Sequence, residues 1–213
     1  MESARIRMST LLAATTAIVL LEYISCSAVA AALVSPMVAT GLVRTAGIGA
    51  LLMITLKMEG QLGAVGLQSS TLVSGLLKGI VWSMVFGTVV VVGLIVGRLA
   101  GINLIGLFQS RMPQQPSDIL SYFIVGAGVA PIAEEIYFRG LVYGYLRRWG
   151  PIVAIMASTL LFVAVHPDLQ KMPFPRIVGG LLFAIAYETE KNLMVPIGIH
   201  MLGNLALFSL PLL

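Results

Sequence analysis

Long apolar runs constrain this 213-residue sequence more than any other feature. A run of about 20 mostly apolar residues can cross the hydrocarbon core of a bilayer as an α-helix. Backbone groups in lipid must be hydrogen-bonded within their own segment, so such a run is helical even where it is rich in β-branched residues. We interpret about seven runs as spans, at residues 8–34, 41–58, 72–96, 119–146, 152–165, 175–189 and 193–213.

The composition favours an integral membrane protein. Apolar residues make up 58% of the chain and charged residues 10%, and the mean hydropathy is +0.99, whereas soluble domains are roughly 45–50% apolar and 25% charged. The net charge of +4 comes from 13 Lys and Arg residues scattered along the chain. Scattered cations are typical of anchors at the lipid headgroups. We therefore expect a multi-pass protein of a prokaryotic cytoplasmic membrane, in contact with the lipid bilayer and with no nucleic-acid partner.

These runs predict an all-α fold, a polytopic transmembrane helical bundle with its active-site pocket between the C-terminal helices. A soft boundary near residue 115 separates N-terminal spans and a connecting loop, residues 1–115, from a four-helix part, residues 116–213, that holds every motif. The single cysteine, Cys26, excludes an intrachain disulfide and a cysteine-based zinc site. The sequence does not specify the oligomeric state.

Two adjacent glutamates lie in the middle of the fourth run. A charge near the bilayer centre costs at least about 2.5–3.5 kcal/mol on insertion scales, so Glu134 and Glu135 mark a functional site. On a helix, Glu135 and Arg139 share one face in the favourable order for an ion pair. Glu134 lies about 100° further round the helix, which leaves its carboxylate for chemistry. The alternative is that Glu134 is a second ligand of Arg139.

The two histidines of the chain lie at two further runs, His166 directly after the fifth run and His200 within the seventh. Each belongs to a pair spaced four residues apart, Phe162 with His166 and His200 with Asn204, and such pairs share a helix face. At 1.5 Å per residue from the anchor around Arg147, Glu134 and His166 lie about 20 and 22 Å deep, hence at one level. Because polar groups facing lipid are expensive, we expect all three helices to direct them into one interior pocket.

A carboxylate and an imidazole in a partly dehydrated pocket can activate water as a general base. The amide of Asn204 can stabilise a developing oxyanion, so the predicted chemistry is hydrolysis. Simpler interpretations stay open: His166 as an interface histidine, His200 with Asn204 as an interhelical hydrogen-bond pair, and Phe162 as packing. Glu22, a carboxylate within the first run, has no sequence-local partner, and its role as a substrate or structural contact is also open.

The motifs Glu134-Glu135-x-x-x-Arg139, Phe162-x-x-x-His166 and His200-x-x-x-Asn204 follow one another in this order. Together they resemble the CPBP family of intramembrane proteases, which includes the CaaX prenyl proteases, over about residues 117–208. The resemblance implies a glutamate-type endopeptidase in which Glu134 and His166 activate the attacking water and His200 and Asn204 form the oxyanion site. Glu135, Arg139 and Phe162 would support these groups, and residues 116–213 would form the catalytic core.

The implied substrate is a membrane-anchored or lipid-modified protein, and the implied reaction needs no cofactor. A zinc-dependent version of the protease is an alternative, since two histidines and a carboxylate suit zinc, although the chain has no His-Glu-x-x-His motif. A catalytically inactive interaction or immunity protein of the same fold is a second alternative. A small proton-coupled transporter is a third, disfavoured by the lack of repeated halves. The sequence does not name the substrate or the scissile bond.

Overall fold

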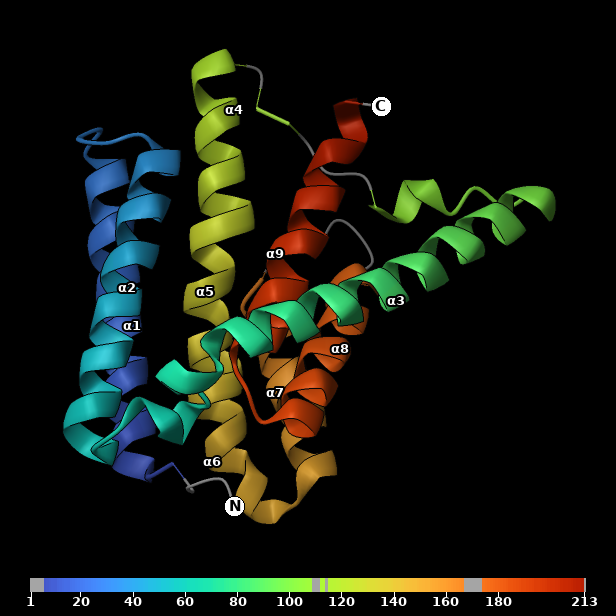
Figure 1. Ribbon diagram of the computed structural model, residues 1–213. Helices are drawn as coiled ribbons and strands as arrows, with labels where there is room; N and C mark the ends of the chain where they lie inside the picture. The colour runs from blue at the N-terminus through green and yellow to red at the C-terminus, as the bar shows by residue number, and fades with distance from the viewer. Residues whose placement is uncertain (1–5, 109–111, 114, 167–173, 213) are drawn as a thin grey trace.

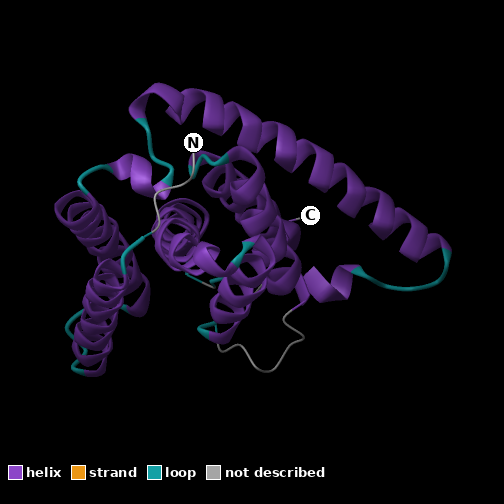
Figure 2. Cartoon of the chain, turned by 90° about the horizontal axis from the view of Figure 1, so that it is seen from below, coloured by secondary structure: helices purple, strands orange, loops and turns teal. Residues whose placement is uncertain are grey.

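The computed structural model describes residues 6–108, 112–113, 115–166 and 174–212, and every regular element in these ranges is helical (Figure 2). Three long helices come first: α1 (Met8–Ala30), α2 (Pro36–Glu59) and α3 (Leu72–Leu99). The short 3₁₀ helices η1 (Leu62–Val65) and η2 (Ser69–Thr71) join α2 to α3, and η3 (Ile105–Phe108) follows α3. The predicted all-α class is confirmed.

One long helical rod carries the two adjacent glutamates. It consists of α4 (Pro116–Phe123), η4 (Ile124–Val129), α5 (Ala130–Glu135), η5 (Ile136–Tyr143), α6 (Gly144–Leu146) and η6 (Arg147–Trp149), which lie in line in Figure 1. Both η4 and η5 are π-helical, so wider turns flank α5 on either side. Such turns are frequent at functional sites. The chain then forms α7 (Pro151–Ala164), α8 (Phe174–Glu190), α9 (Met194–Ser209) and η7 (Leu210–Leu212).

Within the described ranges, five helical segments are long and apolar enough to cross a membrane. They are Met8–Ala30, Pro36–Glu59, Ser69–Leu99, Asp118–Trp149 and Met194–Leu212. The prediction of about seven spans is therefore too high. Helix α7 has 14 residues, about 21 Å at 1.5 Å per residue, which is short of the roughly 30 Å hydrocarbon core. Helix α8 has 17 residues and carries Glu188 and Glu190 at its end.

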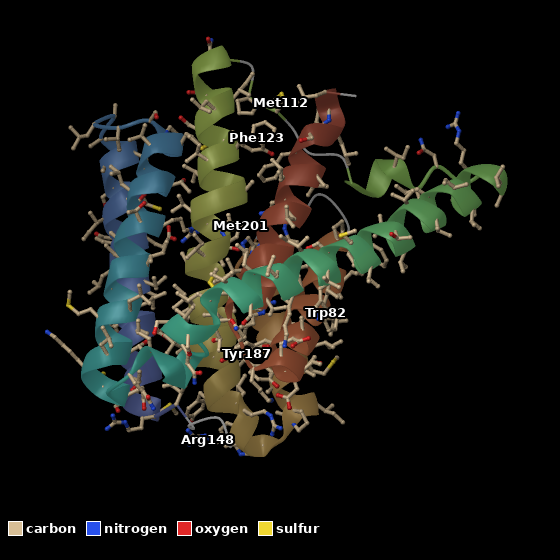
Figure 3. The ribbon with its side chains drawn as sticks, viewed as in Figure 1. Trp82, Met112, Phe123, Arg148, Tyr187 and Met201 are labelled. Carbon is tan, nitrogen blue, oxygen red and sulfur yellow. The ribbon has the colours of Figure 1, made fainter. Side chains whose placement is uncertain are left out.

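Glycines allow α3 to cross α9 closely. A Cβ on Gly79 would lie 2.9 Å from the backbone oxygen of Val195, and one on Gly198 would lie 3.5 Å from Cα of Gly79. Trp82, labelled in Figure 3, donates a hydrogen bond to Glu190 at 3.2 Å and ties α3 to the end of α8. Beyond this crossing α3 extends away from the bundle (Figures 1 and 2). Its exposed apolar side chains there suit contact with lipid.

The apolar core fixes the half of the rod that follows α5. Its fully buried side chains come from several places along the chain. They include Ile6 before α1, Leu51 in α2, Val65 in η1, Ile136 and Leu141 in η5, and Leu193 directly before α9. At the end of the rod Arg148 (Figure 3) donates a hydrogen bond to the carbonyl of Ile6 at 2.6 Å. Helix α2 packs on α5, and α3 packs on α9. Elements from both sides of residue 115 thus share one bundle, and the division there stays a prediction.

Candidate active site

Glu134 lies between the two imidazoles of the chain. Its Oε1 is 3.7 Å from Nε2 of His166, and its Oε2 is 3.8 Å from Nε2 of His200. The carboxylate comes from α5, His166 follows the end of α7, and His200 lies in α9. The glutamate side chain is 14% exposed and that of His200 is 6% exposed. Three helices far apart in sequence therefore bring one acid and two imidazoles together, as their depth and polarity predicted.

The other nitrogen of each imidazole is held by the protein. Nδ1 of His166 is 2.7 Å from the carbonyl oxygen of Phe162, one turn earlier in α7. Nδ1 of His200 is 2.8 Å from Oε1 of Glu135. A carbonyl oxygen only accepts, so Nδ1 of His166 carries the proton of the neutral ring and leaves Nε2 as an acceptor. Both rings are thereby fixed with Nε2 directed at Glu134.

The ion pair expected from the spacing of Glu135 and Arg139 is present and entirely buried. Nη1 of Arg139 lies 3.0 Å from Oε1 of Glu135, and both side chains have 0% exposure. Nη2 of the same guanidinium donates to the carbonyl of Gly180 in α8 at 3.1 Å. The pair thus joins α5 to α8, and through His200 it also reaches α9. Truncating one partner of such a pair leaves an uncompensated buried charge.

Phenylalanine rings enclose this ion pair. The guanidinium carbon of Arg139 lies 4.7 Å from the ring centre of Phe162 and 5.2 Å from that of Phe183. Phe162 also packs against His166, with 4.8 Å between ring centres. Phe183 stacks on His200, with 4.5 Å between ring centres and 21° between ring planes. Because a stacked ring restricts how the imidazole can turn, Phe183 helps to orient His200.

Sequence reasoning did not select Phe183. It lies in α8, which carries none of the three motifs. Phe162 was selected for its spacing from His166, and the structure places it against both His166 and Arg139.

Asn204 lies one turn beyond His200 and contacts the π-helical part of the rod. Its Nδ2 donates a hydrogen bond to the carbonyl oxygen of Gly126 in η4 at 2.8 Å. A primary amide has two N–H groups, so this contact leaves one of them for another acceptor. The predicted oxyanion role of Asn204 stays a prediction.

Glu22 has a partner that sequence proximity could not reveal. Nη1 of Arg44, in the next span, donates a hydrogen bond to Oε1 of Glu22. The two residues are 22 positions apart, but α1 and α2 are neighbouring antiparallel helices (Figure 1).

In the part of the chain that the structure describes, no group of three or more His, Cys, Asp and Glu side chains has a geometry that could hold a metal ion. Glu134, His166 and His200 are close together without forming such a ligand set. The metal-free chemistry expected from the sequence stays a prediction.

Comparison with known proteins identifies relatives of the C-terminal part. Residues 116–206 match the family model described as Rce1-like, the type II CAAX prenyl endopeptidase Rce1-like proteins. The membrane-embedded CAAX protease MroQ of Staphylococcus aureus (strain USA300) is 36% identical over 83 residues, which cover 36% of this chain and 33% of that protein. A protein of Bacillus subtilis (strain 168) named as a membrane peptidase, YdiL, is 35% identical over 82 residues, which cover 38% of this chain and 33% of that protein. The match thus spans a third of each relative, and no solved structure matches. The resemblance drawn from the three motifs is confirmed.

Proposed function

We propose that this chain is an intramembrane endopeptidase that hydrolyses a peptide bond in a membrane-anchored or lipid-modified protein. Its match to the Rce1-like CAAX endopeptidase model over residues 116–206 supports this proposal. The observation that carries the proposal is the position of Glu134 between two imidazole Nε2 atoms, at 3.7 and 3.8 Å. These separations exceed a direct hydrogen bond. They suit groups that share one water molecule.

In the proposed reaction Glu134 removes a proton from this water as the water oxygen attacks the scissile carbonyl carbon. His166 hydrogen-bonds the same water through Nε2 and relays the proton to the leaving amine as the C–N bond breaks. His200, in its imidazolium form, donates from Nδ1 to Glu135 and from Nε2 to the developing oxyanion, and the free amide N–H of Asn204 is a second donor. The products are a carboxylate from the attacked side and a free amine from the other.

The buried groups around Glu134 would act through position. Glu135 and Arg139 hold the Nδ1 side of His200, and Phe183 and Phe162 restrict the rings. Preorganised donors of this kind stabilise developing charge without reorganising during the reaction.

Cleavage of a pool of membrane-anchored proteins in proteoliposomes tests the proposal. Wild type, Glu134→Gln and His166→Ala would be compared, with Glu190→Gln at the far end of α8 as a matched control. We expect wild type and the control to release the same fragments, and both site variants to release none above background. Background levels of fragments from all four proteins would instead favour the inactive interaction or immunity protein of the same fold, and equal cleavage by all four would rule out the catalytic roles of Glu134 and His166.

A further inference from the structure

A second ion pair lies inside the membrane spans, outside the family-matching segment. The carboxylate of Glu22 in α1 accepts a hydrogen bond from Nη1 of Arg44 in α2, and the two side chains are 42% and 25% exposed. Both residues precede residues 116–206. Charged residues inside spans are costly and commonly mark substrate or ion paths. The catalytic proposal does not use either of them.

The position of Arg44 along the axis of the rod, relative to Glu134, follows from contacts between helices. Figure 1 shows α2 and the long rod running in the same direction. A Cβ on Gly41 would lie 3.0 Å from a side-chain methyl group of Val125, so these two residues are level. Arg44, three residues further along α2, therefore comes level with Gly128. Glu134 is six residues deeper, about 9 Å along the axis at 1.5 Å per residue.

Contacts of α1 lead to the same level. Ile6 meets Arg148 through a hydrogen bond of 2.6 Å, and the hydroxyls of Thr15 and Tyr137 are 2.9 Å apart. Helix α1 thus runs opposite to the rod, and Glu22, seven residues or two turns beyond Thr15, comes level with about residue 130 at this pitch. The Glu22–Arg44 pair therefore lies on the α4 side of Glu134.

The guanidinium of Arg44 retains a donor inside the protein. Glu22 accepts from Nη1, whereas Nε is buried and has no hydrogen-bond partner among the described residues. Arg44 also lies within electrostatic range of the carboxylate of Glu134. A guanidinium edge can bind a carboxylate through two parallel N–H···O bonds, because the spacing of its two donors matches that of the two carboxylate oxygens.

We propose that Arg44 binds a carboxylate of the substrate while the scissile bond lies at Glu134. This inference rests on the proposed peptidase function. An extended peptide that runs along the rod rises about 3.3 Å per residue, so an axial offset of about 9 Å places the carboxylate about three residues from the scissile bond. The carboxylate is either the free C-terminus of the substrate or an Asp or Glu side chain. Glu22 holds Arg44 in position and balances its charge when no substrate is bound.

Three lipid-anchored peptides built on one cleavage site from the substrate pool test this inference. The first ends in a free carboxylate three residues after the scissile bond, the second is amidated there, and the third is amidated but has Asp at that position. For wild type in proteoliposomes we expect kcat/KM to be about 10- to 100-fold higher for a carboxylate peptide than for the plain amide, as for one charge-assisted hydrogen-bond pair. Whichever carboxylate peptide is preferred identifies the source.

Arg44→Gln should remove this preference by slowing the preferred peptide more than the plain amide, so that the two peptides are cleaved alike. Glu22→Gln should retain the preference. The double variant Glu22→Gln with Arg44→Gln leaves no unpaired charge, so it replaces Arg44→Gln if that protein does not fold. Arg98→Gln, an exposed arginine of α3, is the matched control and should behave as wild type. The inference is overturned if every variant retains the preference, or if Arg44→Gln slows all three peptides equally.

Binding of the same peptides to Glu134→Gln protein, followed by fluorescence anisotropy, separates the two proposals. We expect this protein to bind the preferred peptide about 10-fold or more tightly than the plain amide, and Arg44→Gln on the same background to bind both alike. Cleavage that depends on Glu134 but shows no carboxylate preference in either assay overturns the role of Arg44 alone. A carboxylate preference in binding, with no Glu134-dependent cleavage, overturns the peptidase proposal alone.

Discussion

His200 and Arg139 bind the same oxygen of Glu135. Nδ1 of His200 lies 2.8 Å from Oε1 of Glu135, and Nη1 of Arg139 lies 3.0 Å from that oxygen. The second carboxylate oxygen of Glu135 is buried and has no hydrogen-bond partner among the described residues. One buried carboxylate therefore links the guanidinium that joins α5 to α8 with the imidazole that faces Glu134.

Replacing Glu135 should cost stability as well as activity. Glu135→Gln leaves the guanidinium of Arg139 buried without its counter-charge, and breaking a buried pair in this way costs about 3–5 kcal/mol. Chemical unfolding of the purified protein in detergent would measure this loss. Glu190→Gln removes the partly exposed pair with Lys78 and should cost no more than about 1 kcal/mol. Equal losses for the two variants would contradict the structural role of Glu135.

Replacing Phe183 should lower turnover while substrate binding is retained. Phe183→Leu keeps an apolar side chain of similar size but removes the ring that stacks on His200 and covers Arg139. Aromatic stacking contributes about 0.5–1.5 kcal/mol, so kcat should fall about 2- to 10-fold with KM unchanged. Phe183→Tyr retains the ring and should restore most of kcat. A fall in kcat of the same size for Tyr would show that the ring stacking is not the cause.

The crossing of α3 over α9 should depend on Gly79 and not on Gly87. A Cβ at position 79 meets the backbone oxygen of Val195 at 2.9 Å, whereas one at position 87 meets nothing within 4 Å. Gly79→Ala should therefore lower the free energy of unfolding by about 1–3 kcal/mol. Gly87→Ala should leave it unchanged or raise it by up to about 1 kcal/mol, because alanine favours the helix. Unfolding of both variants in detergent tests the contrast, and equal behaviour would contradict the close crossing.

Removal of metal ions should leave the proposed hydrolysis intact. The mechanism uses Glu134 and two imidazoles and assigns no step to an ion. Protein treated with a chelator and dialysed should therefore retain its kcat/KM for a membrane-anchored substrate. Lasting inhibition that only zinc reverses would establish the zinc-dependent alternative.

Most of the fold could be predicted because lipid allows few choices. The first three runs and the fourth, which carries Glu134, correspond to α1, α2, α3 and the long rod. The count of spans was too high because residues 152–165 are apolar but form a helix of 14 residues, and apolarity alone does not report length.

The candidate site could be predicted only where a residue was expensive to place in lipid. Glu134, His166 and His200 are polar groups in apolar helices, so their meeting was foreseeable. Phe183 has no such signal, because an apolar ring is equally stable facing lipid and packed against His200. Arg44 was missed for another reason: its pairing with Glu22 depends on how α1 and α2 are set side by side.

Cleavage in ¹⁸O-labelled water tests the central claim most directly, that Glu134 activates a water molecule to hydrolyse a peptide bond. A purified membrane-anchored substrate would be incubated with wild-type protein or Glu134→Gln in proteoliposomes, and the new C-terminus would be weighed by mass spectrometry. We predict that wild type releases a product with ¹⁸O in its new carboxylate and that Glu134→Gln releases no product above background. An unlabelled product, or labelled product formed at the same rate by Glu134→Gln, would contradict the account.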